Sequence, residues 1–125
     1  MIVHTILYLP GESKAQMLET IEYLNLQEIQ GIKLQLLHVL RDTDLYNDYQ
    51  RYPFPLPSME EYLDFLGTCL CALRPDIVVH RLTGDGPKPL LVAPLWTSNK
   101  RLVLNQMGKV FKEKDIWQGK TCRTL

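Results

Sequence analysis

A strand that runs directly into a helix through a Pro-Gly turn is the feature that most constrains how this sequence can fold. Residues 3–9 form a β-branched and apolar run, Pro10 and Gly11 form the turn, and Ser13 opens a helix. Parallel α/β sheets are built by repeating such strand–turn–helix units. The sequence therefore predicts an α/β fold. Because the unit begins at residue 3, we expect the chain to enter that fold partway through.

The spacing of apolar side chains extends this pattern along the chain. The predicted strands cover residues 3–9, 32–39 and 76–82. The predicted helices cover residues 14–26, 58–73 and 98–112, with a short helix or ordered loop over 41–52. Capping boxes are expected at Ser13 and Ser58, and Ser98 is expected to cap the last helix. Leu102 is expected to face inward on that helix, together with its apolar neighbours.

The first two predicted strands each have one apolar face and one partly polar face. A polar face on a parallel strand suggests a cavity on that side, which in a barrel is the lumen. Because side chains alternate along a strand, Tyr8 is expected to share this face with His4, Gln35 and Leu37.

Length and charge narrow the class of protein. The chain has 125 residues, which suits one domain but is short for a closed α/β barrel. Its formal net charge is zero, so charge gives no reason to expect a nucleic acid or an anionic membrane as partner. The sequence has no apolar run of membrane-spanning length and no signal-peptide pattern, and its three cysteines fit a reducing compartment. We therefore expect a cytoplasmic protein.

The cysteines do not form a recognisable metal motif. Cys69 and Cys71 lie two positions apart in a predicted helix, so their side chains point roughly 200° apart around the helix axis. Cys122 stands alone near the end of the sequence. We expect three free thiols and no metal site within this chain.

A group of ionisable residues follows the third predicted strand. His80, Arg81 and Asp85 lie where α/β folds bind ligands, at the carboxyl end of a strand. They are candidate substrate-binding residues or, in a weaker alternative, the active residues of a small enzyme. The competing interpretation is a loop held by its own salt bridges.

Five segments in the same order resemble the C-terminal half of radical S-adenosylmethionine proteins, most nearly the YhcC-like group, which is related to coproporphyrinogen dehydrogenases and the Elongator catalytic subunit. These segments are residues 3–13, 31–45, 58–62, 80–87 and 91–100. The first is similar to the Gly-Leu-Pro-Gly-Glu-Thr turn of the superfamily, with Tyr8 standing where that turn has its first glycine.

The resemblance implies a partial TIM-type barrel over residues 1–113, followed by a tail over 114–125. Full-length relatives are expected to bind a [4Fe-4S] cluster and S-adenosylmethionine, and to cleave the latter to a 5′-deoxyadenosyl radical. The Cys-x3-Cys-x2-Cys motif that holds such a cluster is not found in these 125 residues. We therefore expect the motif to lie upstream of Met1, and we expect the chain alone to bind no cofactor and to be inactive.

The resemblance also assigns residues to the former lumen. The candidate remnants of the adenosyl-binding site are Ile6, Tyr8, Leu37, His38 and Val39. The candidate substrate-binding residues are Lys33 and Gln35, in addition to His80, Arg81 and Asp85.

A non-enzymatic interaction module is the alternative function. The strand over residues 3–9 would have one unpaired edge, without proline or lysine to discourage pairing. We expect a homo-oligomer, or a complex with a protein partner, formed through this edge or through the open concave face.

Overall fold

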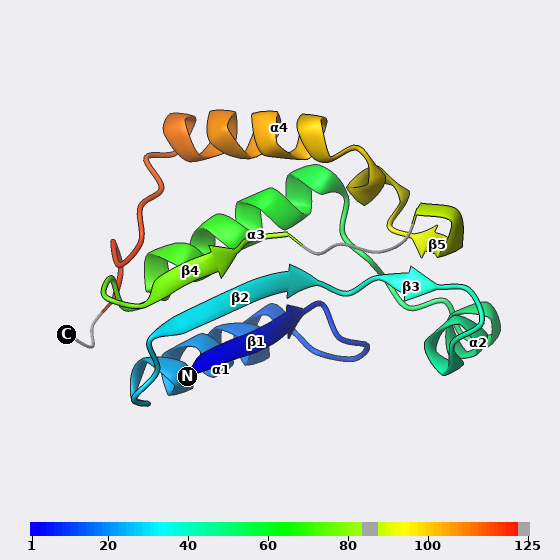
Figure 1. Ribbon diagram of the computed structural model, residues 1–125, viewed down its shortest axis with the longest axis horizontal. Helices are drawn as coiled ribbons and strands as arrows, with labels where there is room; N and C mark the ends of the chain where they lie inside the picture. The colour runs from blue at the N-terminus through cyan, green and yellow to red at the C-terminus, as the bar shows by residue number, and fades with distance from the viewer. Residues whose placement is uncertain (84–87, 123–125) are drawn as a thin grey trace.

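Three parallel strands form the centre of the molecule. The computed structural model describes residues 1–83 and 88–122. Strands β1 (Ile2–Leu7), β2 (Gly31–Leu36) and β4 (Val78–Arg81) form one sheet in the order β1-β2-β4, and both pairings are parallel (Figure 1). The predicted α/β class, with parallel strands flanked by helices, is confirmed.

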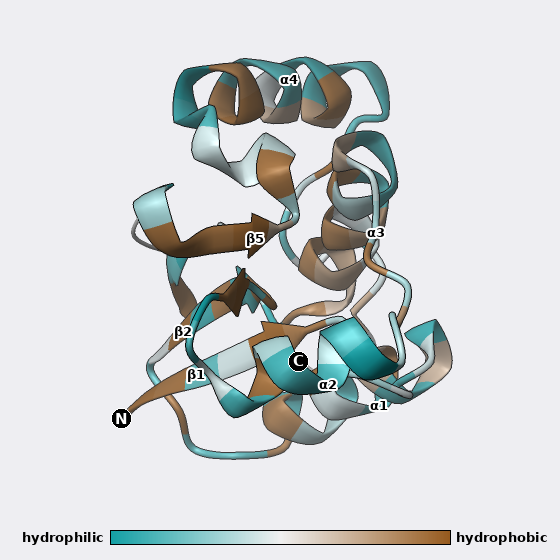
Figure 2. Cartoon of the chain, turned by 90° about the vertical axis from the view of Figure 1, so that its right-hand side faces the viewer, coloured by the Kyte–Doolittle hydropathy of each residue, from teal (hydrophilic) through white to brown (hydrophobic). Residues whose placement is uncertain are grey.

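Two long helices cover one face of this sheet. They are α1 (Lys14–Asn25) and α3 (Met59–Ala72), and both lie on the same side of the strands (Figure 2). Each begins with the expected capping box, at Ser13 and at Ser58, in which the serine hydroxyl accepts a hydrogen bond from the N–H three residues later. These caps fix where each helix starts after the preceding turn.

The hydrophobic core lies between the sheet and these two helices. On β2, Ile32, Leu34 and Leu36 are at most 3% exposed. They pack against apolar side chains of both helices, among them Ile21 of α1 and Leu66 of α3. Burying such side chains contributes about 1.5–3 kcal/mol each, so this layer supplies much of the folding free energy.

The strand predicted over residues 32–39 is in fact two strands. The β2 strand ends at Leu36, and β3 (Val39–Leu40) pairs with the antiparallel β5 (Leu91–Ala93) in a separate small sheet. Between them, His38 folds back so that its Nδ1 lies 2.7 Å from the carbonyl oxygen of Leu36. The chain therefore leaves the main sheet three residues earlier than the apolar pattern suggests.

Shorter elements surround β3 and β5. The α2 helix (Asp44–Arg51) lies within the region predicted as a short helix or loop. The 3-10 turns η1 (Lys88–Leu90) and η2 (Leu95–Ser98) flank β5 and lead into α4 (Lys100–Glu113), which lies beside α3 (Figure 1).

Two expectations about α4 are wrong. Asn99, not Ser98, caps it, because the Asn99 side chain accepts from the N–H of Leu102 while the Ser98 hydroxyl donates to the Leu95 carbonyl in η2. Leu102 is 40% exposed, whereas Val103 and Met107 are buried. The buried stripe is therefore narrower than the sequence suggests.

The segment after α4 runs along α3. The N–H of Gly119 donates to the Leu70 carbonyl, and the N–H of Thr121 donates to the Cys71 carbonyl. Ile116 packs where Gly67 leaves space on α3. Among the described residues, no helix is both long and apolar enough to cross a bilayer.

Candidate functional site

The second face of the three-stranded sheet is open. In Figure 1 no described element lies in front of β1, β2 and β4. We call this surface the open face. It is lined by the side chains that alternate with the buried ones: Ile2, His4 and Ile6 of β1, Lys33 and Gln35 of β2, and Val78 and His80 of β4. Predicted lumen-lining positions on β1 and β2 thus come together on one surface.

Basic residues line up across the open face. His4 lies opposite Lys33 in register, and Lys33 lies opposite Arg81. Neighbouring strands are about 4.8 Å apart, so these three backbone positions fall within about 10 Å. The register shifts after Ile32, which leaves His80 as the extra residue of a bulge beside this row.

Four hydrogen-bonding side chains on the open face have no partner among the described residues. Lys33 and Gln35 are half-buried, and His4 and His80 are exposed. None of the four side chains makes a hydrogen bond or an ion pair with a described residue. A partly buried lysine usually has a carboxylate or carbonyl partner, and none of the described residues provides one for Lys33.

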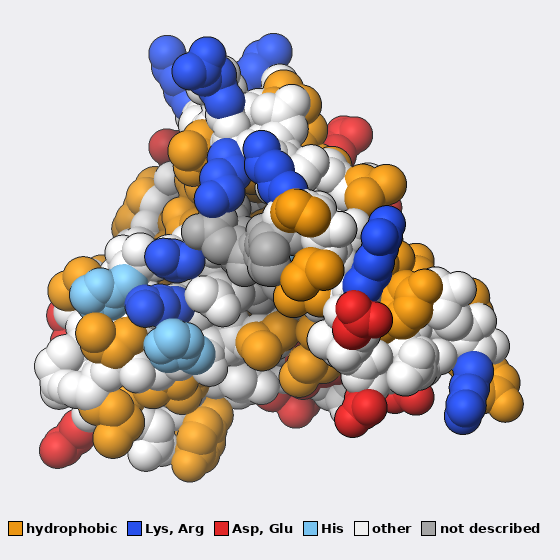
Figure 3. All heavy atoms as spheres, turned by 45° about the vertical axis from the view of Figure 1, so that its right-hand side comes forward, with side chains coloured by type: hydrophobic (Ala, Val, Ile, Leu, Met, Phe, Trp, Pro, Cys, Tyr) orange, Lys and Arg blue, Asp and Glu red, His pale blue; other side chains and the backbone are white. Residues whose placement is uncertain are grey.

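Charge is also unevenly distributed over the surface. The described residues that line the open face include no Asp or Glu. In Figure 3, two His side chains lie next to Lys or Arg side chains, and no acidic side chain is drawn within this group. The chain as a whole has zero net charge, so the basic character belongs to this surface and not to the composition.

The remaining predicted site residues are placed differently. Ile6 lies opposite Gln35 and is 42% exposed on the open face. Leu37 is buried, and its N–H donates to the Leu7 carbonyl. The Val39 side chain is fully buried where β3 pairs with β5. Asp85 lies outside the described residues.

Tyr8 does not share a face with His4, so that expectation is wrong. Tyr8 follows the last residue of β1 and has φ of 68°, a left-handed conformation that ends the alternation of the strand. Its ring packs against α3, with centroids 6.3 Å from Tyr62 and 5.8 Å from Phe65. Its N–H donates to the sulfur of Met17 on α1 at 3.2 Å.

The Tyr8 hydroxyl is buried and has no hydrogen-bond partner among the described residues. Burial, with a smaller contribution from the nearby Glu61 carboxylate, raises the pKa of Tyr8 to about 12. The phenol is therefore neutral at physiological pH.

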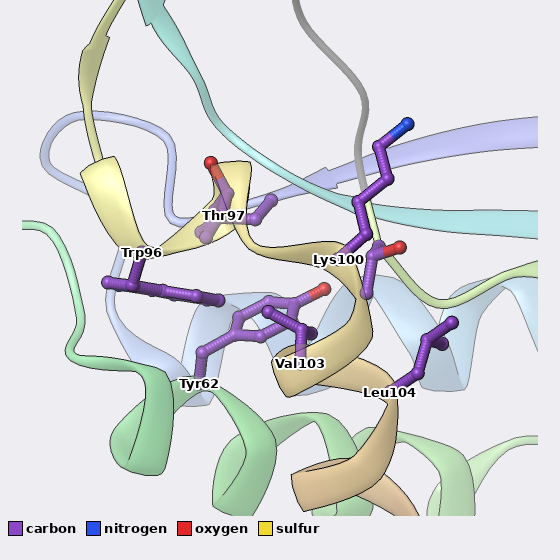
Figure 4. A pocket seen from close by; sticks show the side chains of 8 residues that line it. Tyr62, Trp96, Thr97, Lys100, Val103 and Leu104 are labelled. Atoms are coloured by element: carbon purple, nitrogen blue, oxygen red, sulfur yellow. The ribbon is translucent and has the colours of Figure 1, made fainter. Parts of the chain in front are cut away.

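A partly open pocket lies on the helix side of the sheet, apart from the open face. Its volume is about 160 Å³, and its walls are Leu36, Tyr62, Thr83, Trp96, Thr97, Lys100, Val103 and Leu104 (Figure 4). The rings of Tyr62 and Trp96 meet with centroids 5.8 Å apart. Their polar atoms are satisfied within the protein, because Tyr62 donates to the Leu82 carbonyl and Trp96 donates to the Pro57 carbonyl.

This pocket was not predicted from the sequence. Its walls come from β2, α3, η2 and α4, which are distant in sequence and adopt unrelated periodicities. The aromatic residue Trp96 within an apolar stretch was the only signal, and such a residue is also typical of an ordinary core.

The three cysteines do not converge. Cys69 and Cys71 are both buried on α3, and Cys122 is half-buried, 3.7 Å from the amide nitrogen of Asn25. Burial raises the pKa of Cys69 to about 12, so it is a thiol and not a metal-binding thiolate. Within residues 1–83 and 88–122, no three His, Cys, Asp or Glu side chains are placed to hold a metal ion. These residues do not fit an iron–sulfur cluster.

Comparison with known proteins places this architecture. The family model of the Radical_SAM C-terminal domain matches residues 29–113. The uncharacterised protein YtqA of Bacillus subtilis is 35% identical over 122 residues, covering 98% of this chain and 38% of YtqA. Protein YhcC of Escherichia coli is 26% identical over 113 residues, covering 90% of this chain and 37% of YhcC.

A solved structure has the same fold. The archaeal Elp3 of Methanocaldococcus infernus, with an N-terminal deletion, matches with a TM-score of 0.71 at 16% identity, over 94% of this chain and 28% of that one. The chain thus spans less than two fifths of the curated relatives it matches. The family match extends over more than half of the sequence, as the resemblance of its segments predicted, and the chain belongs to the Radical_SAM C-terminal domain family.

Proposed function

We propose that this chain forms the C-terminal part of a radical S-adenosylmethionine barrel and that its open face lines the reaction chamber. The observation that carries this proposal is the one-sided covering of the sheet. Helices α1 and α3 pack on one face of β1 and β2, and the other face presents polar side chains, among them Lys33 and Gln35, that have no partner in the described part of the chain. In barrels of parallel strands, the helix-covered face points outward and the other face points to the interior.

The cluster itself would have to be held by residues outside this chain. Three thiolates must approach one cluster. Here two of the three cysteines, Cys69 and Cys71, are buried on α3. We therefore propose that the chain alone does not cleave S-adenosylmethionine, and no step of such chemistry is assigned to its residues.

The adenosyl group would contact the open face near the carboxyl ends of β1 and β2. Ile6 offers an exposed apolar surface there. The segment formed by Leu37 and His38 follows directly and would contribute backbone groups. The side chain of Val39 is enclosed by β5, so that residue would act by supporting the segment.

The substrate would lie beside this position. Lys33, Gln35 and His80 face the same surface, and Arg81 lies in register with Lys33. All four offer hydrogen-bond donors, which suits a polar substrate.

Reconstitution with iron and sulfide under anaerobic conditions tests this function. The chain alone should stay colourless and should yield no 5′-deoxyadenosine from S-adenosylmethionine with a strong reductant. A stoichiometric absorbance near 400 nm, about where thiolate-ligated iron–sulfur clusters absorb, would contradict the proposal.

A protein-interaction role is the second candidate, and it is favoured by β1. This strand is at the edge of the sheet and pairs only with β2 among the described strands. Ile2 is 48% exposed and Ile6 is 42% exposed on the adjoining open face. An unpaired edge next to exposed apolar side chains favours addition of another strand.

We propose that a second copy or a protein partner covers this edge in solution. Light scattering at tens of micromolar should then give a mass above that of one chain. A His4→Pro substitution in β1 should reduce it, because the His4 N–H lies on the unpaired edge, whereas odd-numbered residues such as Leu7 pair with β2. A monomer whose β1 amides exchange slowly would contradict this role.

A further inference from the structure

We propose that the open face binds an oxyanion, a carboxylate or phosphate group of an organic ligand, between Lys33, His4 and His80. The binding itself stands on this chain alone. That the ligand is the substrate rests on the function proposed above.

Lys33 carries a charge that no described residue neutralises. Lys33 is partly buried on the sheet, and its ammonium group has no carboxylate or carbonyl partner among the described residues. The two strand neighbours in register are His4 and Arg81, neither of which can supply negative charge. A bound anion would give the Lys33 ammonium group a partner of opposite charge.

Hydrogen-bond donors from neighbouring strands lie around Lys33. Gln35 lies two residues along the same face of β2, and His80 projects from the bulge of β4. Donors from three strands therefore surround the position of Lys33, with exposed Ile2 and Ile6 at the sides. A charged point within a partly apolar surface is typical of a site that orients an organic ligand by one anionic end.

The ring of His80 lies over residue 31 of β2. The Gly31 position has no side chain, and a Cβ there would lie 2.5 Å from Nε2 of His80. The ring therefore lies directly over the backbone of β2, beside Lys33. Its position next to the basic row depends on the absence of a side chain at residue 31.

The test is a titration of the isotope-labelled chain, followed by amide and side-chain NMR shifts. Inorganic phosphate and acetate serve as separate probes, with chloride used to hold the ionic strength constant. We expect saturable shifts confined to His4, Lys33 and His80 with at least one probe. The stronger probe then distinguishes phosphate from carboxylate.

Two lysine variants distinguish anion binding at this site from general attraction of anions to positively charged side chains. Lys33→Gln should weaken binding about tenfold, because it removes one charge-assisted hydrogen bond. Lys109→Gln is the matched control, since Lys109 is an exposed lysine on α4, and it should leave binding unchanged. His80→Gln provides a second lesion at the site if Lys33→Gln does not fold.

Non-saturable or dispersed shifts with both probes, or equal binding by Lys33→Gln and Lys109→Gln, would overturn the inference. Neither result bears on cleavage of S-adenosylmethionine, which is measured separately, so the failure of one proposal is distinguishable from the failure of the other.

Discussion

The imidazole ring of His80 occupies the space that a side chain at Gly31 would take. A Cβ at residue 31 would lie 2.5 Å from Nε2 and 2.7 Å from Cδ2 of this ring. Since real Cβ atoms do not approach other atoms so closely, Gly31→Ala must displace His80. This contact links the sequence of β2 to the geometry of the open face.

Gly31→Ala should therefore move the His80 ring but change the free energy of unfolding by less than about 1 kcal/mol, because the ring is the end of an exposed side chain that can rotate away. Chemical denaturation and the His80 ring resonances measure the two effects. The control is Gly108→Ala in α4, where nothing lies within 4 Å of the new Cβ. That change should stabilise the protein by about 0.5–1 kcal/mol. An equal displacement of the His80 ring by Gly31→Ala and by Gly108→Ala would contradict this contact.

Asn25 should be among the most sensitive polar residues. Its side chain accepts from the N–H of Arg74 and donates to the carbonyl of Ala72, so it joins the end of α1 to the end of α3. Asn25→Ala leaves both backbone groups unpaired and should cost about 2–3 kcal/mol in denaturant unfolding. Asn105→Ala, on the exposed side of α4, should cost less than about 0.5 kcal/mol. A cost at Asn25 no larger than this would show that the pairing is unimportant.

The two buried tyrosines should respond in opposite directions to loss of the hydroxyl. Tyr62 donates to the Leu82 carbonyl at 2.7 Å, so Tyr62→Phe should destabilise the chain by about 1 kcal/mol. The Tyr8 hydroxyl has no partner among the described residues, so Tyr8→Phe should be neutral or stabilising by up to about 1 kcal/mol. Thermal or denaturant unfolding of both variants decides the matter, and a loss of stability in Tyr8→Phe would reveal a partner for that hydroxyl.

Alkaline pH should weaken the fold. Burial raises the pKa of Cys69 from 9.0 to about 12, and burial raises the pKa of Tyr8 from 10.0 to about 12. The folded state therefore holds these protons more tightly, so its stability is constant below about pH 9 and falls as the pH rises toward 12. Denaturant unfolding from pH 7 to 11 measures this decline. In Cys69→Ala the decline should be shallower, and a stability that rises with pH would contradict the assignment.

The same burial predicts which thiol reacts. Cys122 is half-buried, whereas Cys69 and Cys71 are enclosed by α3 and its neighbours. A thiol reagent at neutral pH should label Cys122 first, and the other two should react at the rate of unfolding. Rapid labelling of Cys69 in the folded state would mean that α3 opens locally.

Local signals in the sequence were sufficient to predict where α1 and α3 begin. The capping boxes at Ser13 and Ser58 lie within four residues of sequence, and both helices begin where they indicate. The alternation along β2 likewise identified that Ile32 is on the buried face of this strand and Lys33 is on the other face.

Features set by the tertiary fold were not accessible in this way. Tyr8 reverses direction because φ is positive immediately after β1, and no alternation rule applies beyond a strand end. The first glycine of the superfamily turn falls at this same position. A left-handed backbone accounts for a glycine there without any cofactor contact. The pairing of Val39 with Ala93 after the strand break, and the contact of Trp96 with Pro57 beside the pocket, depend on partners distant in sequence.

We propose that this chain is one part of a radical S-adenosylmethionine barrel. Its open face lines the chamber, and the cluster is held by residues outside this chain. The most direct test replaces the matching segment of YtqA by this chain and measures 5′-deoxyadenosine formed from S-adenosylmethionine under strong reduction. Intact YtqA, this chain alone and the truncated YtqA alone are measured beside it. The account predicts product from the chimera and from intact YtqA, and none from either part alone. Product from this chain alone, or a chimera that carries a cluster but forms no product while intact YtqA does, would contradict it.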